Sequence, residues 1–409
     1  MVVATSSERS SPQRNLRKPR LGLAFGSISH TCYKTTFIPV RKSLLKLARA
    51  VNRIVFAITV LAVTTAFADI GYQFVTVGNP GNSNDTVEQG TGSGLYLGGV
   101  NYIYSMGKYD VTVSQYTTFL NAVAATDNYS LYHPSMATDL NIAGISKTGS
   151  SGSYAYSVIG SGQHPVTYVS WFDAARFANW MANGQPVGLG EVAASTEQGA
   201  YTLNGLTSGG LSITKNSNAA YWIPGENEWY KAAYYDPNLN GGSGGYWQYP
   251  TRSNTAPGNI VGGSANQANY RYSSTGGLLY SVTQSSSLSS KQNYLTDVGA
   301  FTQSASSYGT YDMGGEVYQW DDTVKGSTRG LRGGTWSNNY LRLMSSSRGD
   351  VQDPAFESNI IGFRLATSVP EPTTIISFIV GVGILACWRK RKRVNPNQPK
   401  QRRQVGVSL

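Results

Sequence analysis

Residues 309–320 read Gly-Thr-Tyr-Asp-Met-Gly-Gly-Glu-Val-Tyr-Gln-Trp, and residues 332–336 read Arg-Gly-Gly-Thr-Trp. Glycine tolerates positive φ angles and close backbone approach, so the pairs Gly314-Gly315 and Gly333-Gly334 each predict a tight turn beneath a packed aromatic side chain. Oxygen-bearing side chains recur at short intervals in this stretch, namely at Asp312, Glu316, Gln319, Asp321 and Asp322. Such a set suits a hard cation such as calcium. It equally suits a plain Gly-Asp turn in a loop-rich domain.

The composition favours a loop-rich extracellular domain over a helical cytosolic enzyme. The 409 residues include 46 Gly and 27 Tyr, and only 13% are charged. The formal net charge of +11 is confined to the two ends of the chain. Residues 69–369 carry fourteen Lys/Arg against twenty Asp/Glu, a net charge of −6. Because this central part has no basic surface for a phosphate backbone, we expect no nucleic-acid partner.

The N-terminal residues 1–68 are predicted to be a disordered extension followed by a secretory signal peptide. A basic region from Arg41 to Arg53 precedes an apolar run over 54–67. The small residues Ala66 and Ala68 then form an A-x-A cleavage site, so the mature protein would begin at Asp69. The apolar run is short for a spanning helix, which disfavours an uncleaved anchor. Cys32 and Cys387 are the only cysteines, and both lie in the terminal segments.

The C-terminal end resembles a PEP-CTERM sorting signal over residues 369–393. The residues Pro370, Glu371 and Pro372 form the box, an apolar stretch covers 375–388, and a basic cluster covers 389–393. This resemblance implies export through the secretion machinery and transient membrane anchoring by the C-terminal segment. It also implies processing by an exosortase-type peptidase of a Gram-negative bacterium, at the cell surface or beyond it. The alternative is a plain C-terminal anchor, and the polar tail 394–409 departs from the usual signal.

Three helices are predicted between the ends. Apolar residues recur at helical spacing over 111–124, with Thr112 as the expected cap. Ser170 and Asp173 form a capping box before an Ala-rich helix that reaches about Met181. A third helix is expected over 226–235. The segment 70–104 predicts strands and turns, including strands at 72–77 and 95–97, whereas 127–163 and 238–290 are rich in Gly, Ser, Asn and Tyr and have no period.

Blocks of sequence spread over about residues 72–367 resemble, in order, the motifs of the formylglycine-generating enzyme (sulfatase-modifying factor) family. They are Tyr109-Asp110-Val111-Thr112, His164-Pro165-Val166, Ser170-Trp171-Phe172-Asp173, Trp222-Ile223-Pro224 with Glu226 and Glu228-Trp229, the two stretches quoted first, and Gly362-Phe363-Arg364. The resemblance implies one domain over residues 69–368. It also implies an α+β, C-type-lectin-like fold that is loop-rich, with short strands and about three short helices.

The family's oxidase chemistry is not expected here. The resemblance implies that two copper-binding cysteines would follow Gly333-Gly334, yet residues 335–345 contain none, and neither does any part of 69–369. Thiolates are the soft ligands that copper needs, so the sequence argues against copper. The related three-histidine iron site is disfavoured too, because only His133 and His164 remain after removal of the signal region. A Ser-His-Asp triad stays open, since triads are defined in space.

The resemblance implies a calcium site built from the side chains of Asp312 and Gln319 and the carbonyls of Gly315 and Val317. Gln319 replaces a family glutamate and removes one negative charge, which would weaken the site. A second site would fall near Asn269. The remaining motif residues are expected to brace the fold or line a cleft, with Glu226 and Glu228 capping or bracing and not acting as an acid/base pair. They are Glu226, Glu228, Trp229, Arg332, Gly333, Gly334, Trp336 and Arg364.

From these observations we expect an exported, membrane-sorted protein that binds a glycan or peptide, or serves in a surface matrix. Aromatic and amide side chains in the loops support binding, including Tyr246-Trp247-Gln248-Tyr249, which either stack on sugars or pack the loop. The alternative is a metal-dependent oxidoreductase of the same family that acts on an unknown substrate.

Overall fold

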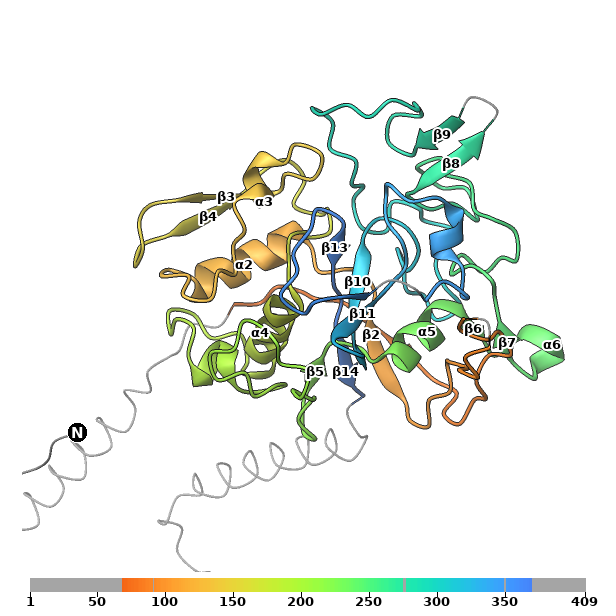
Figure 1. Cartoon of the computed structure of the whole chain (residues 1–409), viewed down its shortest axis with the longest axis horizontal. Helices are drawn as coiled ribbons and strands as arrows, with labels where there is room; N and C mark the ends of the chain where they lie inside the picture. The colour runs from red at the N-terminus through yellow and green to blue at the C-terminus, as the bar shows by residue number, and fades with distance from the viewer. Residues whose placement is uncertain (1–67, 91, 275–276, 349–350, 370–409) are drawn as a thin grey trace, which may run out of the picture. The chain divides into compact units, whose positions relative to one another are not determined.

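The computed structural model describes residues 68–90, 92–274, 277–348 and 351–369 (Figure 1). The predictions on Ala66, on Pro370, Glu371 and Pro372, and on the apolar stretches at both ends lie outside the described residues. Ala68 is described, and its N–H donates to the carbonyl of Gln185 at 3.0 Å. None of the helices in the described ranges is long and apolar enough to cross a membrane.

The three predicted helices are present. They are α2 (Val113–Val123), α4 (Trp171–Ala182) and α5 (Glu226–Tyr234). Thr112 caps α2 in a capping box with Gln115, and Ser170 caps α4 in a capping box with Asp173. Each box satisfies backbone N–H groups that would otherwise lack partners, which explains why the helices begin at these residues. Both predicted caps are confirmed.

Two four-stranded sheets form the centre of the described domain (Figure 1). In the first the spatial order is β1 (Phe74–Val77), β2 (Tyr104–Gly107), β14 (Ala366–Ser368) and β5 (Tyr221–Trp222), and all neighbours are antiparallel. In the second it is β12 (Val351–Gln352), β11 (Thr328–Arg332), β10 (Tyr318–Lys325) and β13 (Ile361–Gly362), with only β10 and β13 parallel. Each sheet therefore joins strands far apart in the sequence.

Small hairpins and helical turns decorate this centre. The hairpins pair β3 (Ile145–Thr148) with β4 (Ala155–Val158), β6 (Tyr235–Asp236) with β7 (Gly245–Tyr246), and β8 (Arg271–Ser274) with β9 (Gly277–Tyr280). The turns are α3 (Ser135–Thr138), α6 (Leu239–Gly242), the π-helix η1 (Ala193–Glu197) and the 3₁₀ helix η2 (Tyr340–Leu343). The predicted strand at 95–97 is absent. Its carbonyls instead accept from the loop residues Asp85 and Gln89, so the segment pairs with a loop outside any regular ladder.

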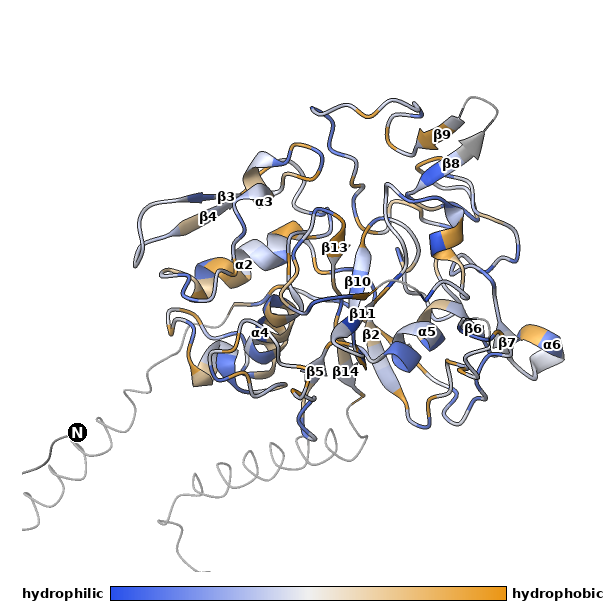
Figure 2. Ribbon diagram, viewed as in Figure 1, coloured by the Kyte–Doolittle hydropathy of each residue, from blue (hydrophilic) through white to orange (hydrophobic). Residues whose placement is uncertain are grey.

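Aromatic rings from helices and loops fill the core. Phe119 of α2 packs edge-on against Phe177 of α4, with ring centroids 5.3 Å apart, and Phe363 packs against Phe177 at the same distance. All three rings are fully buried. Figure 2 shows hydrophobic residues along the loops as well as the helices. Because loop residues such as Tyr201, Leu203 and Leu295 are buried, the loops contribute to the core.

The glycine pairs form the predicted turns. Gly315, Gly333 and Gly334 have φ angles of +84°, +105° and +77°, which side chains rarely adopt. A Cβ atom on Gly333 would lie 3.0 Å from the Met313 carbonyl oxygen and 3.4 Å from the ring of Trp229. The second pair therefore packs directly against the first turn and beneath an aromatic ring.

Candidate functional site

A cavity of about 660 Å³ opens beside the N-terminus of α5. Its walls come from the loop before β2, from β5, from the first turn of α5, from β10 and from the loop that carries Arg348. The lining residues are Leu95, Leu97, Gly99, Val100, Asn101, Tyr102, Lys215, Trp222, Ile223, Gly225, Glu226, Asn227, Glu228, Asp322, Thr323 and Arg348. We call this cavity the cleft. Its volume is in the range of small-molecule sites in proteins.

A β-bulge in β10 supplies one wall of the cleft. Trp320 pairs with Leu331 and Val324 pairs with Arg329, so extra residues of β10 lie between these two pairs. The bulged residues include Asp322 and Thr323. The hydroxyl of Thr323 accepts from the N–H of Glu226 at 3.0 Å, which satisfies one N–H of the first turn of α5. Bulges of this kind redirect side chains at strand edges, and here the bulge joins β10 to α5.

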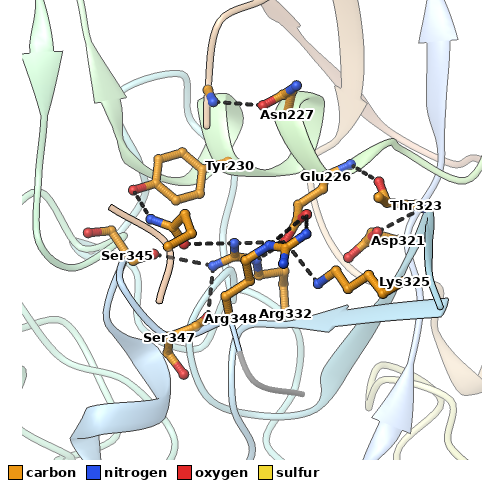
Figure 3. A network of polar contacts seen from close by, with 12 residues as sticks. Glu226, Asn227, Tyr230, Asp321, Thr323, Lys325, Arg332, Ser345, Ser347 and Arg348 are labelled. Atoms are coloured by element: carbon orange, nitrogen blue, oxygen red, sulfur yellow. Dashed lines mark hydrogen bonds and ion pairs between the residues drawn. The ribbon is translucent and has the colours of Figure 1, made fainter. Parts of the chain in front are cut away.

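Three cations surround the carboxylate of Glu226 at the floor of the cleft (Figure 3). Glu226 Oε1 accepts from Arg332 Nη2 at 2.8 Å and from Lys325 Nζ at 2.9 Å. Arg348 grips both oxygens, through Nε at 3.1 and 3.2 Å and through Nη2 to Oε2 at 2.9 Å. Glu226 is almost fully buried. Glu226, which the sequence predicts to brace the fold, therefore forms three ion pairs.

These cations set the charge state of Glu226. Burial alone would raise its pKa, but the charges of Arg332 and Lys325 outweigh burial and hold the pKa at about 2. Asp321 lies nearby and is fully buried, and burial together with the Glu226 charge raises its pKa to about 6. One permanently ionised carboxylate thus faces three cations.

Glu228 lies two residues further along α5 and has different partners. Its carboxylate accepts from the hydroxyl of Tyr102 at 2.6 Å, from the indole N–H of Trp222 at 3.0 and 3.2 Å, and from the N–H of Gly225 at 2.7 Å. The bond to Gly225 caps α5, as expected for this glutamate. Glu228 therefore ties the ring of Tyr102, which is 49% exposed, to the wall of the cleft.

Two further charged groups face the cleft. Lys215 Nζ lies 3.8 Å from the centroid of the Trp222 ring and forms a cation–π contact, which stabilises the charged form of the ammonium group. Asp322 pairs with Arg329 Nη1 at 2.7 Å. Burial raises the pKa of Asp322 to about 7, against the lowering effect of Arg329. Sequence reasoning missed Tyr102, Lys215, Asp322 and Thr323 as cleft residues, because no local pattern links positions that only the fold brings together.

Gln319, one of the predicted calcium ligands, makes hydrogen bonds within the protein through both ends of its amide. Gln319 Oε1 accepts from the indole N–H of Trp229 and from Arg364 Nε, both at 2.7 Å, and Gln319 Nε2 donates to the carbonyl of Asp312 at 2.8 Å. Both ends of the Gln319 amide are therefore engaged, and the guanidinium of Arg364 holds the oxygen that a calcium ion would need. Within the described ranges no group of three or more His, Cys, Asp or Glu residues is arranged to hold a metal. The calcium site stays a prediction.

Carboxylates outnumber cations around Arg364. Arg364 Nη2 lies 3.3 Å from Asp110 Oδ2, and both side chains are fully buried. Burial raises the pKa of Asp110 to about 7 and that of Asp312 to about 6, although Arg364 opposes both shifts. Burial and the Asp312 charge raise the pKa of Glu316 well above its usual range. We call Asp110, Asp312, Glu316 and Arg364 the Arg364 cluster.

Asn269, the residue expected near a second calcium site, serves the turn of the first glycine pair. Its carbonyl accepts from the N–H of Glu316 at 2.8 Å, and its Nδ2 donates to Glu316 Oε2 at 2.8 Å. Thr296 binds both oxygens of the same carboxylate, through its N–H and its hydroxyl at 2.7 Å. Glu316 and Asp312 both have positive φ angles, +63° and +57°. These contacts fix the loop that carries Gly315 and Val317.

The segment 335–345, for which the family resemblance implied copper-binding cysteines, contains or contacts several aromatic side chains. Trp336 stacks on Tyr294 with ring centroids 5.0 Å apart, and Leu343 is fully buried beside Tyr249 and Tyr270. His133 stacks on Tyr168 at 4.7 Å, whereas His164 lies 3.6 Å from Asp297. The two histidines thus have separate neighbours.

The aromatic run at 246–249 packs within the domain. Tyr246 contacts the rings of Tyr230 and Tyr235, and its hydroxyl donates to the carbonyl of Ser83 at 2.7 Å. The Trp247 indole donates to Asp236, and Tyr249 is buried. Of the two interpretations of this run, loop packing is the one that the structure supports.

A model of the sulfatase-modifying factor enzyme 1-like domain matches residues 101–369, and the chain belongs to this family. No curated protein matches the sequence. The predicted fold class is confirmed: the domain is mixed α/β, with few helices, short strands and long loops.

Similar solved structures include CarF, Treponema denticola variable protein 1 and PvdO from Pseudomonas aeruginosa. CarF is 21% identical, with a TM-score of 0.39, and the match covers 73% of this chain and 99% of CarF. The Treponema protein is 17% identical, with a TM-score of 0.41 and coverage of 74% and 99%. PvdO is 16% identical, with a TM-score of 0.36 and coverage of 73% and 92%.

Proposed function

We propose that this member of the sulfatase-modifying factor family is an exported binding protein that takes a glycan in the cleft beside α5. The observation that carries the proposal is the cleft itself, a cavity of about 660 Å³ in which a fixed, half-exposed tyrosine stands among hydrogen-bonding groups. Sugars present apolar ring faces and many hydroxyl groups. A rigid aromatic platform with surrounding amides and charges matches both features.

The platform is Tyr102. Its ring packs edge-on against Tyr104 at 6.0 Å, and its hydroxyl is fixed by Glu228. Asn101 and Asn227 lie exposed beside it on the lining. Because the tyrosine is already ordered by these contacts, a ligand that stacks on it loses little side-chain entropy.

We propose binding, and not the family's oxidation chemistry, because the required cysteines are missing from the sequence. Residues 69–369 contain no cysteine, so no thiolate pair is available to bind copper in the family's manner. The alternative of a metal-dependent oxidoreductase has no observation of its own in the cleft. Export is part of the proposal and rests on the sequence of residues 41–68 and 369–393, with exosortase-type processing and transient membrane anchoring as its consequences.

A glycan array with the full-length protein tests the binding proposal, with Tyr102→Ala as the diagnostic variant. Tyr96→Ala is the matched control, because Tyr96 is 43% exposed on the same loop but does not line the cleft. We expect Tyr102→Ala to weaken glycan binding about tenfold, in line with the loss of one aromatic contact, and Tyr96→Ala to leave it unchanged. Equal effects of the two variants, or no glycan bound by the wild type, would refute the proposal.

A further inference from the structure

The charged groups on the cleft wall differ in how far they are engaged. The three carboxylates are all committed: Glu226 to three cations, Asp322 to Arg329, and Glu228 to three neutral donor groups. A ligand in the cleft therefore meets carboxylates whose oxygens already accept hydrogen bonds. Negative charge on the wall is neutralised or strongly solvated by the protein.

The cations are not matched in the same way. Arg332 is fully buried and, besides Glu226, donates to the carbonyls of Ser345 and Ser347 and to Gln89. Arg348 is the cation of this group that lines the cleft, and its side chain is 26% exposed. Arg348 reaches Glu226 through Nε and Nη2, while Nη1 donates to no residue in the described part of the chain. One face of its guanidinium fork is thus left for a ligand.

Lys215 is the second cation on the lining, and it differs from Arg348 in having no acidic partner in the described part of the chain. Within the described ranges its ammonium group forms no ion pair, and its recorded contact is the face of the Trp222 ring. Lys215 and Arg348 both line the same cavity. Glu226 and the neighbouring Asp321 supply two carboxylates for three cations, so the floor beneath Arg348 keeps one surplus positive charge when both are ionised.

We propose that the ligand of the cleft is an acidic oligosaccharide, whose carboxylate or sulfate groups are bound by Arg348 and Lys215. This inference rests on the proposed glycan-binding function and specifies its ligand class. An arginine with a free N–H edge binds the oxygens of a carboxylate or sulfate well, and lysine adds a mobile point charge. The aromatic ring of Tyr102 then distinguishes a sugar from a simple anion.

Isothermal titration calorimetry of the full-length protein tests the inference with three probes: a trigalacturonate, a sulfated galactose trisaccharide and neutral galactotriose. We expect at least one acidic probe to bind ten times more tightly than the neutral one, and this difference to shrink as salt rises from 50 to 500 mM, roughly the range over which screening becomes strong. Which acidic probe binds more tightly distinguishes carboxylate from sulfate.

Two variants localise the effect. Lys215→Gln and Arg348→Gln should each weaken the acidic probe about tenfold and leave neutral galactotriose unchanged, whereas Lys291→Gln, an exposed lysine outside the lining, should change neither. If Arg348→Gln does not fold, Lys215→Gln still tests the inference, because this substitution removes a contact with the Trp222 ring and breaks no ion pair in the described part of the chain. Equal binding of acidic and neutral probes overturns the ligand class alone. No binding by any trisaccharide overturns the proposed function as well, and tighter binding of a polyglutamate peptide overturns the choice of a sugar.

Discussion

The Glu226 site and the Arg364 cluster are both buried, yet their charge balance is opposite. At the first, Arg332, Lys325 and Arg348 share one glutamate, whose pKa falls to about 2. At the second, Arg364 alone faces several acids, and the pKa of Asp110 rises to about 7. Surplus cations beside a cavity can meet an anionic ligand. Surplus carboxylates that are fully buried must instead take up protons or hydrogen bonds.

We assign ligand binding to the Glu226 site and bracing of the fold to the Arg364 cluster. Arg364 also donates to the carbonyls of Gly107 and Tyr311 and to the side-chain oxygen of Gln319, so one guanidinium joins β2, β10 and the first glycine turn. Among the described residues, no comparable set of backbone contacts holds Arg348. We therefore expect the two regions to respond differently to mutation, pH and ions.

The largest effect should follow from Arg364→Met. Removal of the guanidinium takes the ion-pair partner from buried Asp110 and a donor from the carbonyls of Gly107 and Tyr311, and it leaves Trp229 as the remaining donor to the Gln319 oxygen. Breaking a buried pair in this way costs about 3–5 kcal/mol. Urea denaturation measures it, with Arg252→Met, at an exposed position, as the control. A loss below about 1 kcal/mol would show that Arg364 does not brace the fold.

Glu226→Gln should have the next largest effect, on the order of 3 kcal/mol, because three cations then lose the carboxylate that they share and Asp321 is the one acid left beside them. Glu228→Gln is the matched control on the same helix. Its partners are neutral donors, so we expect a loss of only about 1 kcal/mol. Thermal unfolding in low and high salt separates the two, since salt should restore part of the stability of Glu226→Gln only. Equal losses in both variants would contradict the assigned charge surplus.

The two regions should also give opposite pH dependences. Asp312 keeps its proton up to about pH 6 in the folded state, whereas the unfolded chain releases it near pH 4, so its contribution to stability is lost as pH rises from about 4 to 6. Asp110 extends this loss to about pH 7. The pKa of Glu226 is lowered, so its contribution to the stability of the fold is lost in the opposite direction, as pH falls from about 4.5 toward 2.

Unfolding free energy should therefore be highest near pH 4–5. Asp312→Asn should flatten the slope between pH 4 and 6 by about 1 kcal/mol per pH unit, and Asp353→Asn, at an exposed position, should leave it unchanged. Urea titrations across pH 3–8 check the slopes. Stability that climbs steadily from pH 4 to 7 would contradict the protonation assigned to the Arg364 cluster.

The smallest effect concerns calcium. Gln319 already accepts from Trp229 and Arg364, so we expect calcium or a chelator to shift the melting temperature by less than about 1 °C, the response to a fraction of a kcal/mol in a domain of this size. Differential scanning calorimetry decides it. A calcium-dependent rise of several degrees that Asp312→Ala abolishes would restore the calcium site inferred from the family resemblance.

The sequence predicted the parts of the fold that depend on local chemistry. The caps Thr112 and Ser170 satisfy the first turns of their own helices, and the glycine turns depend on backbone angles, so short patterns suffice. The cleft depends on long-range placement. Tyr102 and Lys215 lie more than a hundred residues apart, and the bulge that presents Thr323 arises from pairing between β10 and β11. No local pattern encodes those contacts. The predicted strand at 95–97 is wrong for a related reason, because the partner of that segment is a loop that its own sequence does not reveal.

The claim that this family member binds and does not oxidise is tested most directly by oxygen consumption. The full-length protein, incubated with copper and a cysteine-containing peptide, is followed with an oxygen electrode while bound copper is measured by mass spectrometry. We predict no uptake above the rate of copper and peptide alone, and no stoichiometric copper. Stoichiometric copper together with protein-dependent oxygen uptake would contradict the claim.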